Sequence, residues 1–284
     1  MRPSRGGGAH GAQPVVIIKP RAGFLDFGLL SVWPYRELLY FLVWRELKVR
    51  YAQAALGVAW VIIQPVFTVA VFTAIFGMFA RIPSDGVPYA VFAFSAVLPW
   101  TYFAEAARRS ALGLIGDAEL VRKIYFPRLI IPLANVIAPA LDFAVGFAVL
   151  VILMLWYGIW PTWNILAVPL LLLMVAGFGL AIGLWLGPIN VRFRDINHTM
   201  PFIFQVWMFA TPIVYPLSMV PERWKGLYSL NPMVGIIEGF RWALLGRDAL
   251  DIQALGVGVT VIFCVLVGGL AFFRRAERFF ADVI

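Results

Sequence analysis

The stretch WNILAVPLLLLMVAGFGLAIGLWLG, residues 163–187, contains no charged side chain and decides the class of fold. A helix rises ~1.5 Å per residue, so roughly 20 apolar residues cross about 30 Å of hydrocarbon, and this stretch is long enough. The composition agrees, because 62% of the residues are hydrophobic, 13% are charged and the mean hydropathy is +0.87. Soluble domains are about 45–50% apolar and about 25% charged, so the sequence predicts a membrane protein.

Other charge-poor stretches of similar length lie on both sides of this one. We expect six transmembrane helices, over residues 57–80, 89–107, 130–157, 163–187, 199–217 and 252–273. The fold class predicted is therefore an all-α integral membrane protein whose transmembrane domain covers residues 34–284. Residues 1–33 contain Gly, Pro and Arg but no apolar run of signal-peptide length, so they are expected to form a cytoplasmic tail.

The Lys and Arg residues lie mostly on one side of these six spans. Of the 23 in the chain, the exceptions are Arg81, Arg223, Lys225, Arg241 and Arg247. Because short loops rich in Lys and Arg stay in the cytoplasm, both termini are expected there. Residues 34–53 mix apolar and charged side chains ahead of the first span and are expected to form an interfacial helix.

Residues 218–248 are expected to form an external re-entrant hairpin before the last span. Pro221 and Pro232 interrupt this region, and a complete crossing here would move the basic C-terminal residues outside. Glu238 and Arg241 stand three residues apart, a spacing at which they can neutralise each other on a helix. A solvated surface ion pair is an equally open interpretation.

Several classes of site are excluded by the composition. Cys264 is the only cysteine, and His10 and His198 are the only histidines, so one chain forms no disulfide and no Cys/His zinc site. No Gly-x-x-x-x-Gly-Lys-Ser/Thr phosphate loop occurs, so ATP would need another subunit. The net charge of +8 comes from short basic blocks between apolar stretches, which indicates membrane topology and not nucleic-acid binding. We predict no catalytic or metal site; a membrane enzyme using Asp142 or Glu105 as a base is the competing class.

Two spans contain residues that are unusual for a helix facing lipid. Asp142 lies in the third span, where an ionisable group costs several kcal/mol and is by default a functional candidate. A hydrogen bond to a neighbouring helix is the alternative, and both stay open. Gly179, Gly183 and Gly187 recur every four residues in the fourth span, which predicts close packing of another helix.

Two basic segments are candidates for binding. The loop at residues 116–128 combines basic side chains with Tyr125 and Phe126, a mixture that favours a protein interface. Arg45, Lys48 and Arg50 form a cationic cluster next to the first span, suited to phosphates or anionic headgroups. In both cases, simple anchoring of the spans by positive charge is the alternative.

A set of short motifs, in order along the chain, resembles the permease subunits of ABC transporters that export bacterial polysaccharides such as O-antigen, capsule or teichoic acid. The motifs are Arg45-Glu-Leu-Lys48-Val-Arg50-Tyr51, Leu56-Gly57, Trp60, Pro65, Leu98-Pro99-Trp100, Lys123-Ile-Tyr125-Phe126-Pro127-Arg128, Asn190-Val-Arg192-Phe193-Arg194-Asp195-Ile196, Thr211-Pro212-Ile213, Tyr215, Asn231-Pro232 and Phe240-Arg241. The resemblance extends from about Tyr35 to the C-terminus. A permease for drugs or small lipids would share most of these motifs and is the closest alternative.

The resemblance implies a homodimer in the bacterial cytoplasmic (inner) membrane that works with two copies of a separate ATP-binding subunit. ATP and Mg would be bound by that subunit, with no cofactor in this chain. The substrate implied is a polyprenyl-pyrophosphate-linked polysaccharide, with membrane lipids as the remaining partners and no nucleic acid.

The resemblance also assigns roles to particular residues. The loop at 116–128 would contain the coupling helix that docks on the ATPase, with a second contact after the fourth span; these residues are Glu119, Arg122, Lys123, Tyr125, Phe126, Arg128, Arg192, Arg194 and Asp195. The pyrophosphate would meet Arg45, Lys48 and Arg50 where the substrate enters from the side. Aromatic residues of the first and fifth spans would line the path between protomers, namely Trp60, Phe67, Phe202, Trp207 and Phe209.

Overall fold

The computed structural model describes residues 32–52, 59–193, 195–246 and 250–283, and in these ranges the chain is helical without strands. The predicted all-α class is therefore confirmed. Most of the expected tail, the first residues of the span expected at 57–80 and Arg194 lie outside the described residues.

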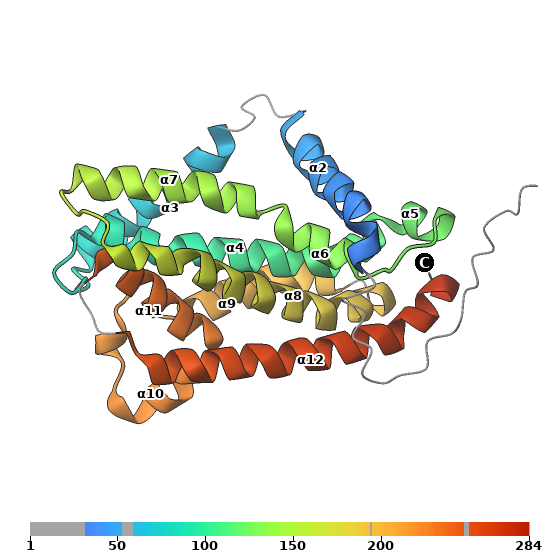
Figure 1. Ribbon diagram of the computed structural model, residues 1–284. Helices are drawn as coiled ribbons and strands as arrows, with labels where there is room; N and C mark the ends of the chain where they lie inside the picture. The colour runs from blue at the N-terminus through green and yellow to red at the C-terminus, as the bar shows by residue number, and fades with distance from the viewer. Residues whose placement is uncertain (1–31, 53–58, 194, 247–249, 284) are drawn as a thin grey trace, which may run out of the picture.

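The helices follow one another with short connections (Figure 1). They are η1 (Trp33–Tyr35), α2 (Arg36–Ala52), α3 (Ala59–Phe72), a π-helical continuation η2 (Thr73–Phe79), α4 (Tyr89–Gly116), α5 (Ala118–Lys123), α6 (Ile130–Ile137), α7 (Ala140–Trp156), η3 (Trp163–Ala167), α8 (Val168–Arg192), α9 (Ile196–Phe209), η4 (Leu217–Met219), α10 (Glu222–Ser229), α11 (Pro232–Leu245) and α12 (Ile252–Val283).

Five helical segments of the described chain are long and apolar enough to cross a membrane, so this is a multi-pass membrane protein. They are Ala59–Phe79, Tyr89–Gly116, Ile130–Trp156, Trp163–Arg192 and Ile252–Glu277. The helices α4, α7, α8 and α12 run along a common direction in Figure 1. The short helix α5 lies at one end of this bundle with the C-terminal part of α12, and α10 lies at the opposite end.

The span expected over residues 199–217 is not among these five segments. Its helix, α9, has 14 residues and would be ~21 Å long, which is shorter than the ~30 Å hydrocarbon layer. The helix ends at Phe209 because Pro212 has no backbone N–H to donate, and the Thr211 hydroxyl bonds back to the Trp207 carbonyl at 2.8 Å. The expected count of six spans is thus not confirmed.

The region expected as a hairpin, residues 218–248, contains the short helices α10 and α11. Asn231 caps α11 by accepting from the Met233 N–H at 3.2 Å, and its amide donates to the Thr211 hydroxyl at 3.0 Å. The helix ends at Gly246, whose φ of +64° is the left-handed conformation that favours glycine. The side chains of α11 are mostly buried among α4, α8 and α12, and the re-entrant placement of the pair stays a prediction.

Glu238 and Arg241 of α11 form the ion pair that their spacing predicted, at 2.7 Å. Arg241 is buried, lies over the Phe92 ring at 3.8 Å and donates to the Ile213 carbonyl at 3.1 Å. The interpretation as a solvated surface pair is therefore wrong, because the guanidinium is enclosed by α4 and by the segment that follows α9.

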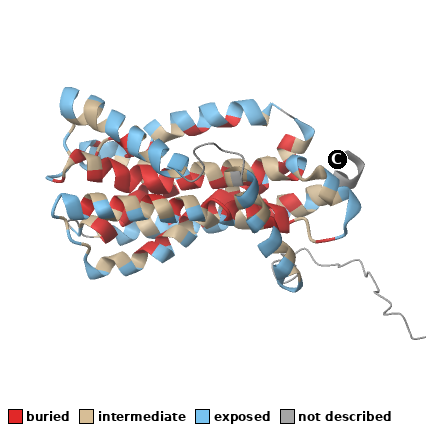
Figure 2. Ribbon diagram, turned by 90° about the horizontal axis from the view of Figure 1, so that it is seen from above, coloured by how far each residue is buried: buried red, intermediate tan, exposed pale blue. Residues whose placement is uncertain are grey.

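The core of the bundle is α4 packed against α8. In the most apolar 18-residue stretch of α4, 78% of the residues are buried, whereas in the corresponding stretch of Ala59–Phe79 only 6% are buried. The helix α4 is therefore central and α3 is peripheral. Buried residues run along the middle of the bundle in Figure 2. A Cβ at Gly179 would lie 3.0 Å from the Ala106 Cβ, and one at Gly183 would overlap Ser110, so the predicted close approach at these glycines is confirmed.

We predict that Gly183→Ala lowers the thermal unfolding temperature by several degrees, because overpacking a tight contact costs about 1–3 kcal/mol. Gly177→Ala on the same helix is the matched control, since its Cβ would lie 3.8 Å from Ile262 in ordinary contact. Alanine is a better helix former than glycine, so the control keeps or slightly gains stability. The unfolding temperature of both variants is measured in detergent micelles. Adding Ser110→Gly should restore the stability of Gly183→Ala, because it removes the overlapping side chain. Equal unfolding temperatures of the two alanine variants would contradict this packing.

Candidate functional site

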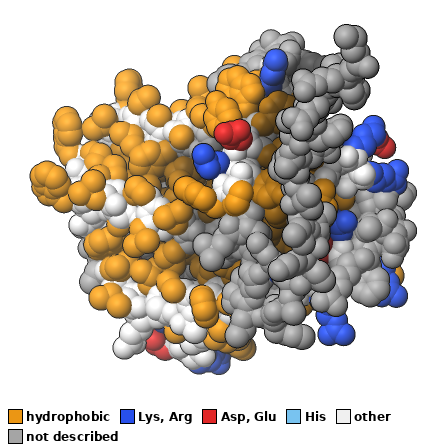
Figure 3. Space-filling view, turned by 45° about the vertical axis from the view of Figure 1, so that its right-hand side comes forward, with side chains coloured by type: hydrophobic (Ala, Val, Ile, Leu, Met, Phe, Trp, Pro, Cys, Tyr) orange, Lys and Arg blue, Asp and Glu red, His pale blue; other side chains and the backbone are white. Residues whose placement is uncertain are grey.

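The candidate coupling helix, α5, lies on the surface at one end of the bundle (Figure 1). Its charged side chains pair with each other, since Glu119 lies 2.7 Å from Lys123 and 3.9 Å from Arg122. Tyr125, just beyond the helix, has 76% of its surface exposed. On the face shown in Figure 3, hydrophobic side chains cover most of the left-hand surface, and several Lys and Arg side chains lie toward the right. The loop thus presents charged groups and the Tyr125 ring at the surface.

Phe126, which the sequence groups with Tyr125 as an interface residue, is instead buried, because only 5% of its surface is accessible. Ile124 ends α5 in an extended conformation, and of the next two residues Tyr125 faces out while Phe126 faces the core. Ile124 is exposed and was not singled out from the sequence, although a lone aliphatic residue between Lys123 and Tyr125 is a plausible contact residue. Arg128 points away from the loop surface and donates to the Glu277 carbonyl of α12.

A network of ion pairs joins α2, α4 and the beginning of α5. Arg45 donates to Asp117 at 2.5 Å and to Glu46 at 3.2 Å, and Glu46 lies 3.6 Å from Arg109. Arg109 in turn contacts Glu105 at 2.5 Å. Burial raises the pKa of the Asp117 carboxyl above its usual value, and Arg45 opposes that shift. Asp117 was not among the residues predicted from the sequence, although an Asp directly before a helix is a common signal for the helix N-terminus.

A second contact ties α2 to the third span. Arg50 and Tyr51 both donate to the Asp142 carboxylate, one to each oxygen. The membrane-embedded carboxylate therefore has both a counter-charge and hydrogen bonds, which supports the structural interpretation of Asp142. It also places Asp142 at the junction of α2 and α7 with its oxygens already occupied.

The three basic residues expected at the substrate entrance have different surroundings. Arg45 and Arg50 are half-buried and engaged with carboxylates, whereas Lys48 is exposed and has no ion-pair partner among the described residues. Arg45 is held by Asp117, and Arg50 is held by Asp142 through one nitrogen while its other two guanidinium nitrogens are enclosed by the protein. Lys48 is thus the most accessible of the three cations.

The turn between α8 and α9 lies at the same end as α5 in Figure 1. Arg192 is exposed and its guanidinium lies 5.3 Å from the centre of the Phe193 ring. Asp195 is exposed at the beginning of α9, while Arg194 lies outside the described residues. Arg192 and Asp195 are therefore exposed at the end of the bundle where α5 lies.

The aromatic residues expected along the path divide into two groups. Trp60 and Phe67 of α3, and Phe202 and Phe209 of α9, are exposed on the protomer surface. Trp207 instead packs at ring-centre distances of 5.3 to 6.2 Å within the core cluster of Trp100, Phe103, Phe178 and Phe204. Stacked and edge-to-face rings of this kind stabilise packing, so Trp207 belongs to the protomer core.

The fold and this end of the bundle define a multi-pass helical membrane protein with an exposed charged loop, and its described residues contain no cluster of metal-ligating side chains. Residues 37–245 match the model of the ABC-2 type transporter family. The chain belongs to that family, so the resemblance stated from its motifs is confirmed. Membership implies an ATP-binding partner subunit, consistent with the missing phosphate loop.

Curated relatives match over most of the chain. The O-antigen export system permease protein RfbA of Myxococcus xanthus is 30% identical over 256 residues, 89% of this chain and 98% of that protein. The protein of the same name from Klebsiella pneumoniae is 27% identical over 249 residues, 87% of this chain and 95% of its own. The polysialic acid transport protein KpsM of Escherichia coli is 24% identical over 241 residues, 82% and 91% of the two chains.

We predict that Asp142→Ala destabilises the protein by about 1–3 kcal/mol, because Arg50 and Tyr51 lose their acceptor in a half-buried site. The double variant Arg50→Met, Asp142→Leu should recover part of this loss, since no unpaired charge remains. Lys48→Ala is the control and should stay within ~0.5 kcal/mol of the parent. Thermal unfolding in micelles measures all three, and a double variant no more stable than Asp142→Ala would contradict this account of the ion pair.

Proposed function

We propose that this chain is the permease subunit of an ABC transporter that exports a lipid-linked polysaccharide across the bacterial cytoplasmic membrane. Two copies would form the membrane part, and two copies of a separate ATP-binding subunit would bind ATP and Mg and drive transport. The observation that carries the proposal is the match to an O-antigen export permease along 98% of that protein's length. The capsule-type relative, named for polysialic acid transport, supports the same class of substrate.

The anchoring of the loop supports a coupling role for α5. The side chains on both flanks of the helix fix it to the bundle: Asp117 pairs with Arg45, Phe126 is buried in the core, and Arg128 bonds to α12. Ile124 and Tyr125 stay exposed between these anchors. A partner that grips these two side chains would therefore pull on α2, α4 and α12 together. In this proposal, α5 faces the cytoplasm and both termini lie on that side.

The exposed faces of α3 and α9 support pairing of two protomers. Both helices are apolar and little covered within one chain, and they expose the aromatic rings of Trp60, Phe67, Phe202 and Phe209. A second copy placed on these faces would bury part of them and leave aromatic surfaces along the seam. Sugar rings have apolar C–H faces that slide along aromatic rings with few fixed hydrogen bonds, which suits a polymer in transit.

The competing class, an enzyme using Asp142 or Glu105 as a base, is disfavoured by the ion pairs. Asp142 accepts from Arg50 and Tyr51, and Glu105 accepts from Arg108 and Arg109 at 2.5 to 3.1 Å. Carboxylates held by arginines are stabilised as anions and are poor proton acceptors. A lipid pyrophosphate would reach Lys48 first, because Lys48 is exposed while Arg45 and Arg50 are half-buried and paired with carboxylates.

We predict that the double variant Ile124→Ala, Tyr125→Ala abolishes surface polymer and weakens capture of the ATP-binding subunit at least about tenfold, since truncating a buried interface anchor costs ~2 kcal/mol or more. Trp163→Ala removes an equally exposed aromatic ring at the opposite end and serves as control. Glycan staining of cells, membrane abundance and co-purification are the readouts. Phe126→Ala is unsuitable as a probe because it would open a cavity in the core. Normal surface polymer in the double variant, at normal abundance, would refute the coupling role.

A further inference from the structure

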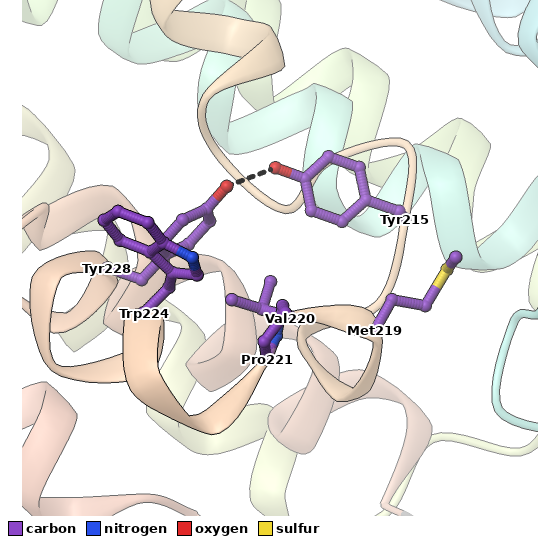
Figure 4. A pocket seen from close by; sticks show the side chains of 6 residues that line it. All are labelled: Tyr215, Met219, Val220, Pro221, Trp224 and Tyr228. Atoms are coloured by element: carbon purple, nitrogen blue, oxygen red, sulfur yellow. Dashed lines mark hydrogen bonds between the residues drawn. The ribbon is translucent and has the colours of Figure 1, made fainter.

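A pocket opens at the end of the bundle opposite α5, between the segment that follows α9 and the short helix α10 (Figures 1 and 4). It has a volume of about 440 Å³, within the range of small-molecule sites. The residues that line it are Tyr215, Met219, Val220, Pro221, Trp224 and Tyr228. None of these six side chains carries a charge at neutral pH, so the pocket is built for a neutral ligand.

The two tyrosine hydroxyls have a defined donor direction. Tyr215 donates its single proton to the Phe209 carbonyl at 3.1 Å. The 3.1 Å contact between the hydroxyls of Tyr215 and Tyr228 must then be donated by Tyr228. Both protons are used, and only acceptor lone pairs remain for a ligand. A phosphate, which is an acceptor, finds no donor on these hydroxyls, whereas an alcohol can donate to them.

The other walls of the pocket are mostly apolar, and the Trp224 indole adds one N–H donor. About half of the Trp224 surface is exposed, and Figure 4 shows its indole and the side chains of Val220 and Pro221 around the same space as the tyrosine hydroxyls. A ligand that fits therefore has an apolar face to lie against aromatic or aliphatic carbon and hydroxyl donors along its edge. A pyranose ring has both properties, with C–H groups on its face and hydroxyls around its rim.

We propose that this pocket is a binding site for a neutral pyranose unit of the exported polymer, held as the chain leaves the membrane. The proposal rests on the proposed function. Its position agrees, because the Phe209 carbonyl that orders Tyr215 belongs to the last residue of α9, whose exposed aromatic face is assigned to the path. A site that a moving polymer passes must bind weakly, and one sugar ring against so open a wall is expected to bind with a Kd of about 1 mM or weaker.

The test is saturation-transfer NMR on the full chain in lipid nanodiscs, where no glycosidic detergent competes. The probes are the methyl pyranosides of glucose, galactose and mannose. The parent protein should transfer saturation to the ring C–H protons of at least one, and Trp224→Ala should lower the signal at least fivefold. Tyr228→Phe should lower it about two- to threefold by removing one acceptor. Trp224→Phe keeps an aromatic face and should keep most of the signal, which separates loss of binding from loss of folding.

Trp160→Ala is the matched control, because it removes an exposed indole that does not line the pocket. No pyranoside signal with the parent, or an unchanged signal with Trp224→Ala, would overturn the site. Displacement of the pyranoside by glycerophosphoethanolamine but not by other pyranosides would also overturn it, by assigning the pocket to lipid headgroups. Surface polymer in cells lacking the gene tests the proposed function separately, since export can depend on this chain whether or not the pocket binds sugar.

Discussion

The close approach of α4 and α8 is the constraint on which the rest of the bundle depends. Gly179 and Gly183 let α8 lie against Ala106 and Ser110 of α4, and no larger residue fits at position 183 without movement. In a membrane, lipid tails are as apolar as leucine, so helices associate through tight packing and hydrogen bonds and not through hydrophobic burial alone. With α4 and α8 fixed, α11 and α12 pack on one side of them and α6 and α7 on the other, and α5 is held at the end of α4.

The sequence predicts those features that depend on the composition of a continuous stretch. Five membrane-length helices, the glycine face of α8 and the Glu238–Arg241 pair all follow from hydropathy or helical spacing, and the structure contains them. The segment at 199–217 shows the limit of this reasoning. Its mean apolar character predicts a span, but the Thr211 hydroxyl and Pro212 end the helix early, and averaging over a window hides both.

Contacts between residues far apart in the chain were not predictable from the sequence, for a different reason. Arg50 and Asp142 are 92 positions apart, and Arg45 and Asp117 are 72 apart, so no periodicity relates them. In the sequence alone, Asp142 is a charge in a span without an explanation, and Arg50 is a cation available to a ligand. The ion pair between them explains both charges by structure, so neither needs a separate functional role. Phe126 differs again, because nothing in the sequence distinguishes it from its neighbour Tyr125, and only the fold determines which of the two aromatic residues faces the core.

These two ion pairs connect α2 both to the third span and to the beginning of α5. Near its C-terminal end, Arg50 and Tyr51 hold the carboxylate of the third span, and five residues earlier Arg45 holds Asp117 at the beginning of α5. Since separating a half-buried ion pair leaves both charges poorly solvated, a displacement of α5 carries Arg45 along more easily than it breaks the contact. The helix that lies beside the lateral surface of the bundle is therefore connected directly to the loop that would meet the ATPase, through side chains and not only through the transmembrane core.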